Sequence, residues 1–295
     1  MEEAGFRSQF RDVLTRLIRP REGANPKIGV ALGGGFARGM AHIGVLRVLE
    51  RHRVPVDYIA GVSAGAIVAS AYASGTSPDE IQSVAQSMRF RDVARWTISR
   101  LGFAQSDRME AFLRRLLKRF RFEEMRVPLA IVASDLGSGR PVIFRDAGDV
   151  VIAIRASCAY PGLFTPVRHA GRYLVDGMVS MEVPASPLRQ MGAGRVLSVA
   201  LPNAETLNPT SMFSVVNRCF QILASRTENE WRRRSDLVIS PRVGALAWDA
   251  FGSCRELIQA GEAAAEAAMP LIEKWLASRR HPAARSHNAA VPLTA

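Results

Sequence analysis

The sequence lacks both a cysteine framework and a long apolar run, and each absence excludes a class of protein. Its three cysteines, Cys158, Cys219 and Cys254, are far apart, odd in number and without a C-x-x-C spacing, so neither disulfides nor a thiolate metal site is indicated. No stretch reaches the roughly 18 apolar residues that a transmembrane helix needs. We expect three small core cysteines in a reducing compartment.

The amino terminus and the net charge bear on where the protein works. Residues 1–6 include two early acids and no apolar stretch followed by a small-residue cleavage site, which argues against a signal peptide. The net charge of +12 predicts attraction to polyanions, either nucleic acid or an anionic membrane. We expect a cytoplasmic location, with peripheral contact at the inner membrane surface left open.

Three regions follow one another along the chain. Residues 1–24 carry apolar side chains at helical spacing and predict an amphipathic helix and a linker. In residues 25–277 short apolar runs alternate with helical stretches, which predicts an α/β domain with a mainly parallel sheet covered on both faces. Residues 278–295, rich in Ala, Arg and Pro, are expected to be a disordered tail. Strands are expected at 28–32, 56–60, 129–134, 141–144, 165–169, 172–175, 196–200 and 237–239, and helices at 40–51, 64–74, from 77 onward, 106–120, 149–158, 210–233 and 248–277.

A glycine-rich loop, residues 33–39, follows the first expected strand and opens a helix. Its backbone N–H groups can converge on an anion beside the helix N-terminus. A P-loop would end in Gly-Lys-Ser/Thr, but Gly39 is followed by Met40. A dinucleotide site would need an acid at the end of the second strand, which instead leads into Gly61. Both phosphate interpretations are therefore poor.

The second strand leads into Gly61-Val62-Ser63-Ala64-Gly65, a G-x-S-x-G sequence between a strand and a helix. That context is the one a nucleophile elbow requires, because the small residues let the chain turn tightly and hold the serine at the edge of the sheet. A serine nucleophile needs a base, and the usual one is a histidine. His42 lies mid-helix and His169 on a strand, and both are expected to be structural. Asp176, at the end of a strand, is on local sequence alone an ordinary Asp-Gly turn.

The order of five motifs resembles that of bacterial patatin-like phospholipases over roughly residues 27 to 200. The motifs are A-L-G-G-G-F-A-R-G-M-A-H-I-G-V-L at 31–46, G-V-S-A-G at 61–65, A-S-D-L at 133–136, R-A-S-C-A-Y-P-G-L-F at 155–164 and D-G at 176–177. The resemblance implies a three-layer α/β/α fold and hydrolysis of lipid acyl esters by a Ser-Asp dyad without histidine. It implies no cofactor or metal, a phospholipid or other acyl ester as substrate, and no nucleic-acid partner.

Carried over position by position, the resemblance gives roles to five residues. Ser63 is the nucleophile and Asp176 is its base, and the oxyanion hole is formed by the amides of Gly34, Gly35 and Phe36. Apart from the resemblance, Arg38 is expected either to orient this loop or to contact a lipid phosphate. The chain departs from the family pattern after Asp176. Met178 stands where the family has Gly or Ala, and Met181 and Glu182 replace asparagines, so substrate choice is less defined than the dyad.

Two other functions remain open beside the lipid acyl hydrolase. An acyltransferase on a related serine-elbow fold would need a catalytic histidine late in the chain, and His281 and His287 lie in the arginine-rich tail. A catalytically silent, membrane-associated regulatory protein could keep the same fold. The presence of both Ser63 and Asp176 counts against that alternative.

The basic segment 89–126 allows two interpretations. Leu113, Leu116, Leu117 and Phe120 form one helical stripe, with Arg114, Arg115, Lys118 and Arg119 mostly off it. Such a helix can lie in a lipid interface or can be a solvated helix that covers the sheet. Because the segment follows the elbow, it could also cap the substrate pocket.

Overall fold

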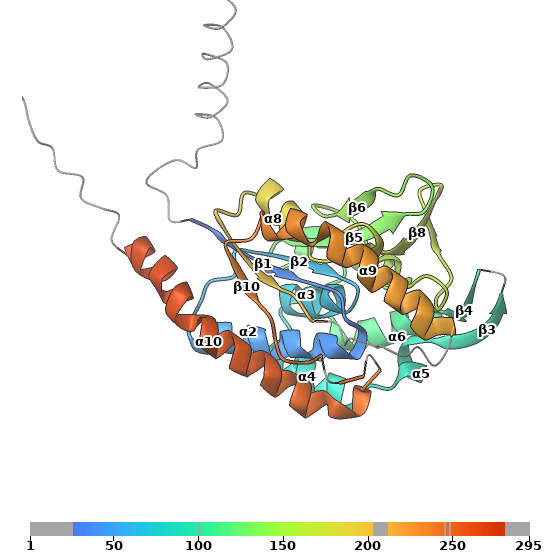
Figure 1. The fold of residues 1–295 in the computed structure, drawn as a ribbon, viewed down its shortest axis with the longest axis horizontal. Coiled ribbons are helices and arrows are strands. Elements are labelled where there is room, and N and C mark those ends of the chain that lie inside the picture. The colour runs from blue at the N-terminus through green and yellow to red at the C-terminus, as the bar shows by residue number, and fades with distance from the viewer. Residues whose placement is uncertain (1–25, 100, 203–211, 245, 248, 281–295) are drawn as a thin grey trace, which may run out of the picture. The chain divides into compact units, whose positions relative to one another are not determined.

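The computed structural model describes residues 26–280 except 100, 203–211, 245 and 248 (Figure 1). The chain divides into two compact units, one of residues 27–269 and one of residues 1–26 and 270–295. The helix expected at 1–24 and most of the tail expected at 278–295 lie outside the described residues, while residues 278–280 are the end of a helix. The first unit holds the sheet and is the subject below.

Residues 27–269 are built around an eight-stranded sheet in the order β10-β9-β1-β2-β5-β8-β7, with β6 also paired to β5. Strands β10, β9, β1, β2 and β5 are mutually parallel, whereas β6 and β8 run antiparallel to β5. The strands are β1 Ile28–Leu32, β2 Tyr58–Val62, β5 Leu129–Asp135, β6 Pro141–Phe144, β7 Val167–His169, β8 Arg172–Asp176, β9 Arg195–Val199 and β10 Leu237–Ile239. Every residue of β1 is buried, as expected for a parallel strand covered on both faces.

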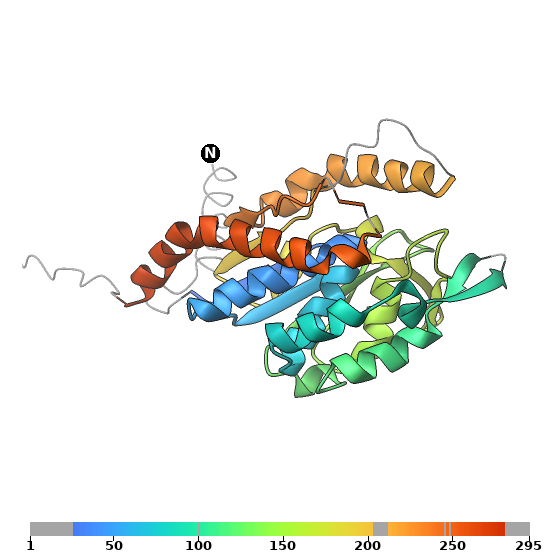
Figure 2. The same ribbon diagram turned by 90° about the horizontal axis from the view of Figure 1, so that it is seen from below.

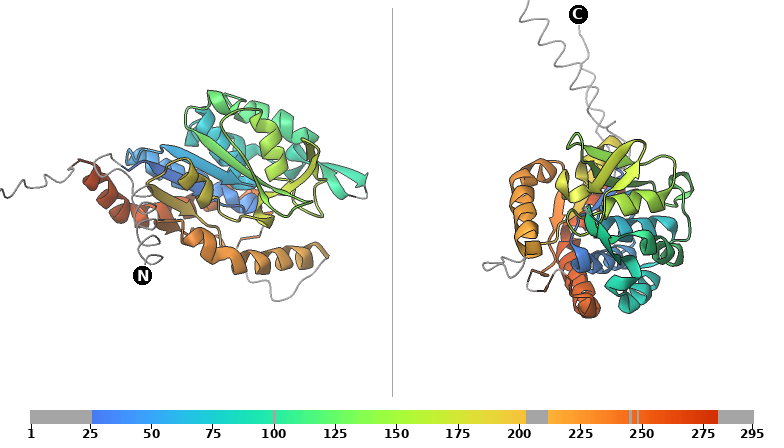
Figure 3. Two further views of the ribbon diagram at one scale, coloured as in Figure 1. Left: turned by 90° about the horizontal axis from the view of Figure 1, so that it is seen from above. Right: turned by 90° about the vertical axis from the view of Figure 1, so that its right-hand side faces the viewer.

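Helices cover both faces of this sheet (Figures 2 and 3). The helices are η1 Phe36–Met40, α2 Ala41–Arg51, α3 Ala64–Ser74, α4 Pro78–Ser87, α5 Phe90–Val93, α6 Asp107–Leu116, η2 Phe122–Glu124, α7 Val150–Ser157, η3 Gly177–Val179, α8 Ala185–Gln190, α9 Met212–Arg232, η4 Phe251–Ser253 and α10 Cys254–Arg280. On one face α8 packs against β1, β2 and β9, together with Trp231 of α9. On the other face α3 and α7 pack against β2 and β5. The three-layer α/β/α fold with a mainly parallel sheet is confirmed, and no described helix is long and apolar enough to cross a bilayer.

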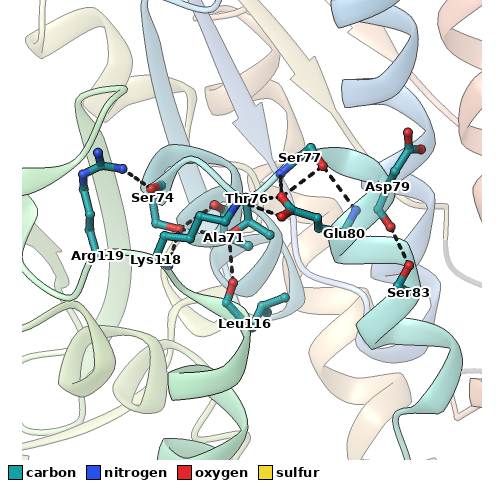
Figure 4. Close-up of polar contacts among 10 residues, drawn as sticks. All are labelled: Ala71, Ser74, Thr76, Ser77, Asp79, Glu80, Ser83, Leu116, Lys118 and Arg119. Carbon is teal, nitrogen blue, oxygen red and sulfur yellow. Dashed lines mark hydrogen bonds and ion pairs between the residues drawn. The ribbon is translucent and has the colours of Figure 1, made fainter.

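Three local expectations are wrong, and one element was not predicted. The helix expected to reach residue 120 ends at Leu116, where the Thr76 hydroxyl donates a hydrogen bond of 2.8 Å to the Leu116 carbonyl (Figure 4). The last helix begins at Cys254 instead of 248 and continues to Arg280. The hairpin of β3 Arg95–Ser99 and β4 Gly102–Gln105 was not predicted. Cys219 is exposed on α9, so only two of the three cysteines are core residues.

The start of α4 links this helix to the end of α6. Ser77 and Glu80 form a capping box, in which each side chain accepts a hydrogen bond from the other residue's backbone amide. Lys118 also donates to the Glu80 carboxylate at 2.7 Å, and this bond, with those from Ser77, lowers the pKa of Glu80 to about 2. Figure 4 shows Lys118 and Arg119 turned toward the Ser74–Glu80 region. These two cations therefore serve to hold α6 in place.

Helices α2 and α10 pack so closely that glycine is required where they meet. A Cβ atom at Gly44 would overlap the backbone carbonyl of Ile258, and one at Gly261 would overlap that of Ala41. We predict that Gly44→Ala lowers the free energy of unfolding by about 2 kcal/mol, measured by urea denaturation. The control is Gly252→Ala, where a Cβ atom meets nothing within 4 Å. Equal stability of the two variants would contradict this packing.

Candidate active site

Ser63 occupies a strained turn between β2 and α3. Its backbone has φ 54° and ψ −124°, a region that residues with a side chain rarely adopt. The neighbouring glycines have a steric reason: a Cβ atom at Gly65 would overlap the backbone carbonyls of Leu32 and Gly33, and one at Gly61 would overlap the first turn of α3. The G-x-S-x-G spacing therefore forms the tight elbow that the sequence predicts.

The Ser63 hydroxyl donates a hydrogen bond to the carboxylate of Asp176. The distance from Ser63 Oγ to Asp176 Oδ2 is 2.6 Å, and both residues are buried. Asp176 ends β8, and the register of this strand places it opposite Ala133 of β5. Strand β5 lies between β8 and β2, the strand that leads into Ser63. The other carboxylate oxygen, Oδ1, accepts from the Met178 amide at 2.9 Å. Sheet pairing thus brings together two groups that are 113 residues apart in the chain.

Burial determines the proton affinity of Asp176. Its side chain has no exposed surface, and burial raises the pKa to about 7, although the hydrogen bonds from Ser63 and the Met178 amide act in the opposite direction. The ordinary pKa of an aspartate is near 3.9, which makes a weak base. The buried carboxylate is a stronger base and is still largely ionised above neutral pH.

Ser157, in the last turn of α7, fixes the backbone of the elbow through hydrogen bonds. Its hydroxyl accepts a hydrogen bond from the Ser63 amide at 2.8 Å and donates to the carbonyl of Val132 on β5 at 2.6 Å. The side chain is fully buried. Sequence reasoning did not single out Ser157, although it lies within the R-A-S-C-A-Y-P-G-L-F motif at 155–164.

The glycine loop is partly committed to other contacts. The Gly33 amide donates to the Val199 carbonyl at 3.0 Å, and the Gly34 amide donates to the Glu182 carbonyl at 3.3 Å. The Gly35 amide donates to no partner among the described residues, and Phe36, at φ 51°, lines the pocket beside Ser63. The Gly34 amide is therefore already hydrogen-bonded in this conformation. An oxyanion hole made of three amides would need this amide to point at the substrate oxygen.

Arg38 and the histidines have structural surroundings. Arg38 is 4% exposed, and its guanidinium donates a hydrogen bond to the Pro202 carbonyl at 3.0 Å. This buried position favours a role in orienting the loop over contact with a lipid phosphate. The His42 ring donates from Nε2 to the Gly33 carbonyl at 2.8 Å, and burial lowers its pKa to about 4. His169 lies on β7 against the ring of Phe144. Neither ring forms a hydrogen bond with Ser63.

An apolar pocket opens beside Ser63. Besides Ser63 it is lined almost entirely by apolar side chains from η1, α3, α4, α5, α6 and the loop after α7, among them Met40, Val84, Phe90, Met109, Phe112 and Phe164. Arg38 and Asp176 do not line it. A pocket of this composition suits a hydrocarbon chain whose reacting end lies at Ser63.

Helix α6 belongs to the wall of this pocket. Leu113, Leu116 and Leu117 are buried, so the apolar stripe of the 89–126 segment faces the protein and cannot lie in a bilayer. Met109, Phe112 and Leu116 line the pocket, as a capping role predicts. Arg114 pairs with Glu110 at 2.8 Å on the exposed side.

The raised pKa of Asp176 predicts a pH-dependent gain of stability in Asp176→Asn. A carboxyl whose pKa is higher in the folded than in the unfolded protein stabilises the fold below pH 4, and this stabilisation is lost as the pH rises through 7. The wild type should lose about 3 kcal/mol from this group between pH 5 and pH 8. Asp176→Asn carries no carboxyl that titrates, so it does not lose this stability. In urea denaturation, the free energy of unfolding of the variant minus that of the wild type should therefore rise from pH 5 to pH 8. A constant difference would contradict the buried, titrating carboxyl.

Ser157→Ala should slow the reaction of Ser63 without unfolding the protein. Loss of the hydroxyl leaves the Ser63 amide without its acceptor, so the strained turn can relax away from Asp176. We predict at least a tenfold lower rate of labelling by a fluorophosphonate. The control is Ser70→Ala in α3, because Ser70 is also buried but its hydroxyl has no partner among the described residues. Equal rates in the two variants would exclude a positioning role for Ser157.

Two relatives are similar to this chain in sequence. The chain is 34% identical over 191 residues to an uncharacterized NTE family protein of Mycobacterium tuberculosis, covering 64% of this chain and 52% of that protein. It is 30% identical over 191 residues to lysophospholipase NTE1 of Cryptococcus neoformans, covering 62% of this chain and 12% of that protein. The chain thus spans about half the length of the mycobacterial relative and a small part of the fungal one.

Solved structures and a family model complete the comparison. The crystal structure of VipD from Legionella pneumophila has the same fold, with a TM-score of 0.50 and 14% identity, covering 85% of this chain and 67% of that one. Residues 30–189, more than half of the chain, match the model of the patatin-like phospholipase family. This match includes the glycine loop, the elbow and Asp176, and the chain belongs to the patatin-like phospholipase family.

Proposed function

We propose that the protein is a serine lipid acyl hydrolase that cleaves carboxylic esters of phospholipids or lysophospholipids through Ser63 and Asp176. The observation that carries this proposal is the 2.6 Å hydrogen bond between the two side chains, with Ser63 lining an apolar pocket. The relatives named lysophospholipase support the same class of substrate. Residues 25–277 form the catalytic domain in this proposal.

The reaction begins with attack by Ser63. Asp176 accepts the hydroxyl proton at Oδ2 while Ser63 Oγ forms a bond to the ester carbonyl carbon. The negative charge that develops on the carbonyl oxygen is stabilised by amides of the glycine loop, for which we assign Gly35 and Phe36. When the tetrahedral intermediate collapses, the alcohol oxygen leaves with the proton held by Asp176. The product is an acyl group esterified to Ser63.

Water completes the cycle. Asp176, again ionised, takes a proton from a water molecule that attacks the acyl carbonyl, and then returns this proton to Ser63 as the fatty acid leaves. The same carboxylate therefore acts as base and acid in both halves, which requires a pKa near the working pH. The pKa of about 7 meets this requirement.

Met178 is the feature most relevant to substrate choice. Its sulfur lies so close to Gly34 that a Cβ atom there would overlap it. The bulky side chain therefore packs against the glycine loop beside the dyad. We propose that it narrows the space for the alcohol part of the ester.

A fluorophosphonate tests the nucleophile and its base together. The wild type should be labelled, with a rate that falls about tenfold per pH unit below pH 7, because only ionised Asp176 can accept the proton. Ser63→Ala should not be labelled, and Asp176→Asn should release fatty acid from phospholipid or lysophospholipid at least a hundredfold more slowly.

The control for the base is His169→Gln, which should keep most of the activity. Labelling that persists in Ser63→Ala would remove this residue from the mechanism. A folded wild type that is neither labelled nor active on phospholipid, lysophospholipid or short-chain ester would favour the catalytically silent alternative.

A further inference from the structure

Helix α9 exposes a continuous apolar stripe. Val215, Cys219, Ile222 and Leu223 are spaced so that they lie on one face of the helix, and all four are exposed, with Leu223 57% exposed. Large apolar side chains gathered on one exposed face commonly mark an interaction surface. The stripe is therefore a candidate interaction surface.

The opposite face of α9 packs against Tyr160, which lies in the loop after α7. Asn217 accepts a hydrogen bond from the Tyr160 hydroxyl at 2.8 Å, and the ring of Phe220 packs edge-on against Tyr160 with centroids 5.6 Å apart. Tyr160 in turn packs against Phe36, with ring centroids 4.8 Å apart. Phe36 lines the pocket beside Ser63. The helix is thus fixed to the pocket by its inner face, and the outer stripe plays no part in this packing.

The β3–β4 hairpin is a second exposed apolar element fixed to the same pocket. Leu101 and Phe103 are 60% and 53% exposed. The backbone of β4 bonds to the Leu163 carbonyl, and Ala104 bridges to Phe164, which is a pocket-lining residue. Figures 1, 2 and 3 all place this hairpin and the amino-terminal end of α9 at the same end of the domain.

The charges beside both elements are basic. Residues 212–227 contain two arginines, Arg218 and Arg226, and no acid. Residues 93–106 also contain two arginines and no acid, although one of them, Arg95, pairs with Asp107 at 2.9 Å. Exposed apolar side chains with basic neighbours are the combination that binds the headgroup region of an anionic bilayer.

We infer that the outer stripe of α9 and the tip of the β3–β4 hairpin form the surface that docks on an anionic lipid bilayer. The inference rests on the proposed function, since a lipid acyl hydrolase must take its substrate from such a surface. Both elements contact pocket-lining residues, Phe36 through Tyr160 and Phe164 directly. Docking there would fix against the membrane the end of the domain that carries Tyr160 and Phe164.

Cys219 allows a direct test, because it lies in the stripe while Cys158 and Cys254 are buried. The Ser63→Ala chain is labelled at Cys219 with an environment-sensitive fluorophore and mixed with phosphatidylcholine vesicles containing about 30% phosphatidylglycerol. We expect a blue shift and quenching by spin-labelled lipid, both of which weaken as salt rises. The matched control carries Cys219→Ser and Arg51→Cys, which moves the label to the exposed end of α2, and should show neither change.

A second variant separates docking from catalysis. Ile222→Ser with Leu223→Ser should lower binding to these vesicles at least tenfold, while fluorophosphonate labelling of Ser63 in the absence of vesicles stays at the wild-type rate. Failure of the labelling alone would contradict the proposed function and leave the docking surface intact. Vesicle binding that leaves the Cys219 label unchanged, or no binding at all, would overturn the inference. A spectral change that depends on protein concentration without lipid would assign the stripe to a second copy of the chain and also overturn it.

Discussion

The hydrogen bond between Ser63 and Asp176 is the constraint on which the rest of the structure depends. It joins two buried groups across the end of the sheet at 2.6 Å. This distance is possible only if β2 and β8 both pair with β5, β2 in parallel and β8 antiparallel, in a register that sets Asp176 opposite Ala133. A shift of one residue in β8 would turn the carboxylate to the other face of the sheet. The change from parallel to antiparallel pairing at β5 therefore belongs to the construction of the dyad.

The dyad combines two features that oppose folding, and the surrounding residues hold both. Ser63 has a strained backbone, and Asp176 is a carboxyl without exposed surface. Ser157 bonds the Ser63 amide to β5, and the Ser134 hydroxyl donates to the Asp176 carbonyl at 2.9 Å. These neighbours come from the rigid sheet and from a helix packed on it. Strain at the reacting groups is thus balanced by the parts of the fold that are least able to move.

Sequence could predict what depends on local chain geometry. The elbow and the glycine loop follow from glycine spacing after strands, and the capping box of α4 follows from the four consecutive residues 77–80. Asp176 needed the family resemblance, because an Asp-Gly pair says nothing about which strand it will face. Helical periodicity predicted the apolar stripe of α6 but could not tell whether the stripe packs against lipid or against the protein. In the structure it packs against the protein. The bond between the Gly34 amide and the Glu182 carbonyl and the role of Ser157 depend on contacts between distant segments, for which sequence has no local sign.

Burial links the chemistry to the substrate pocket. The same water exclusion that suits the pocket to a hydrocarbon chain also raises the pKa of Asp176, since a carboxylate is disfavoured wherever water is removed. An acyl chain in the pocket would cover Ser63, whereas Asp176 is already without exposed surface before any substrate binds. A more polar pocket would hold the acyl chain less well. Recognition of the acyl chain and activation of the nucleophile therefore depend on one physical property of this site, its exclusion of water.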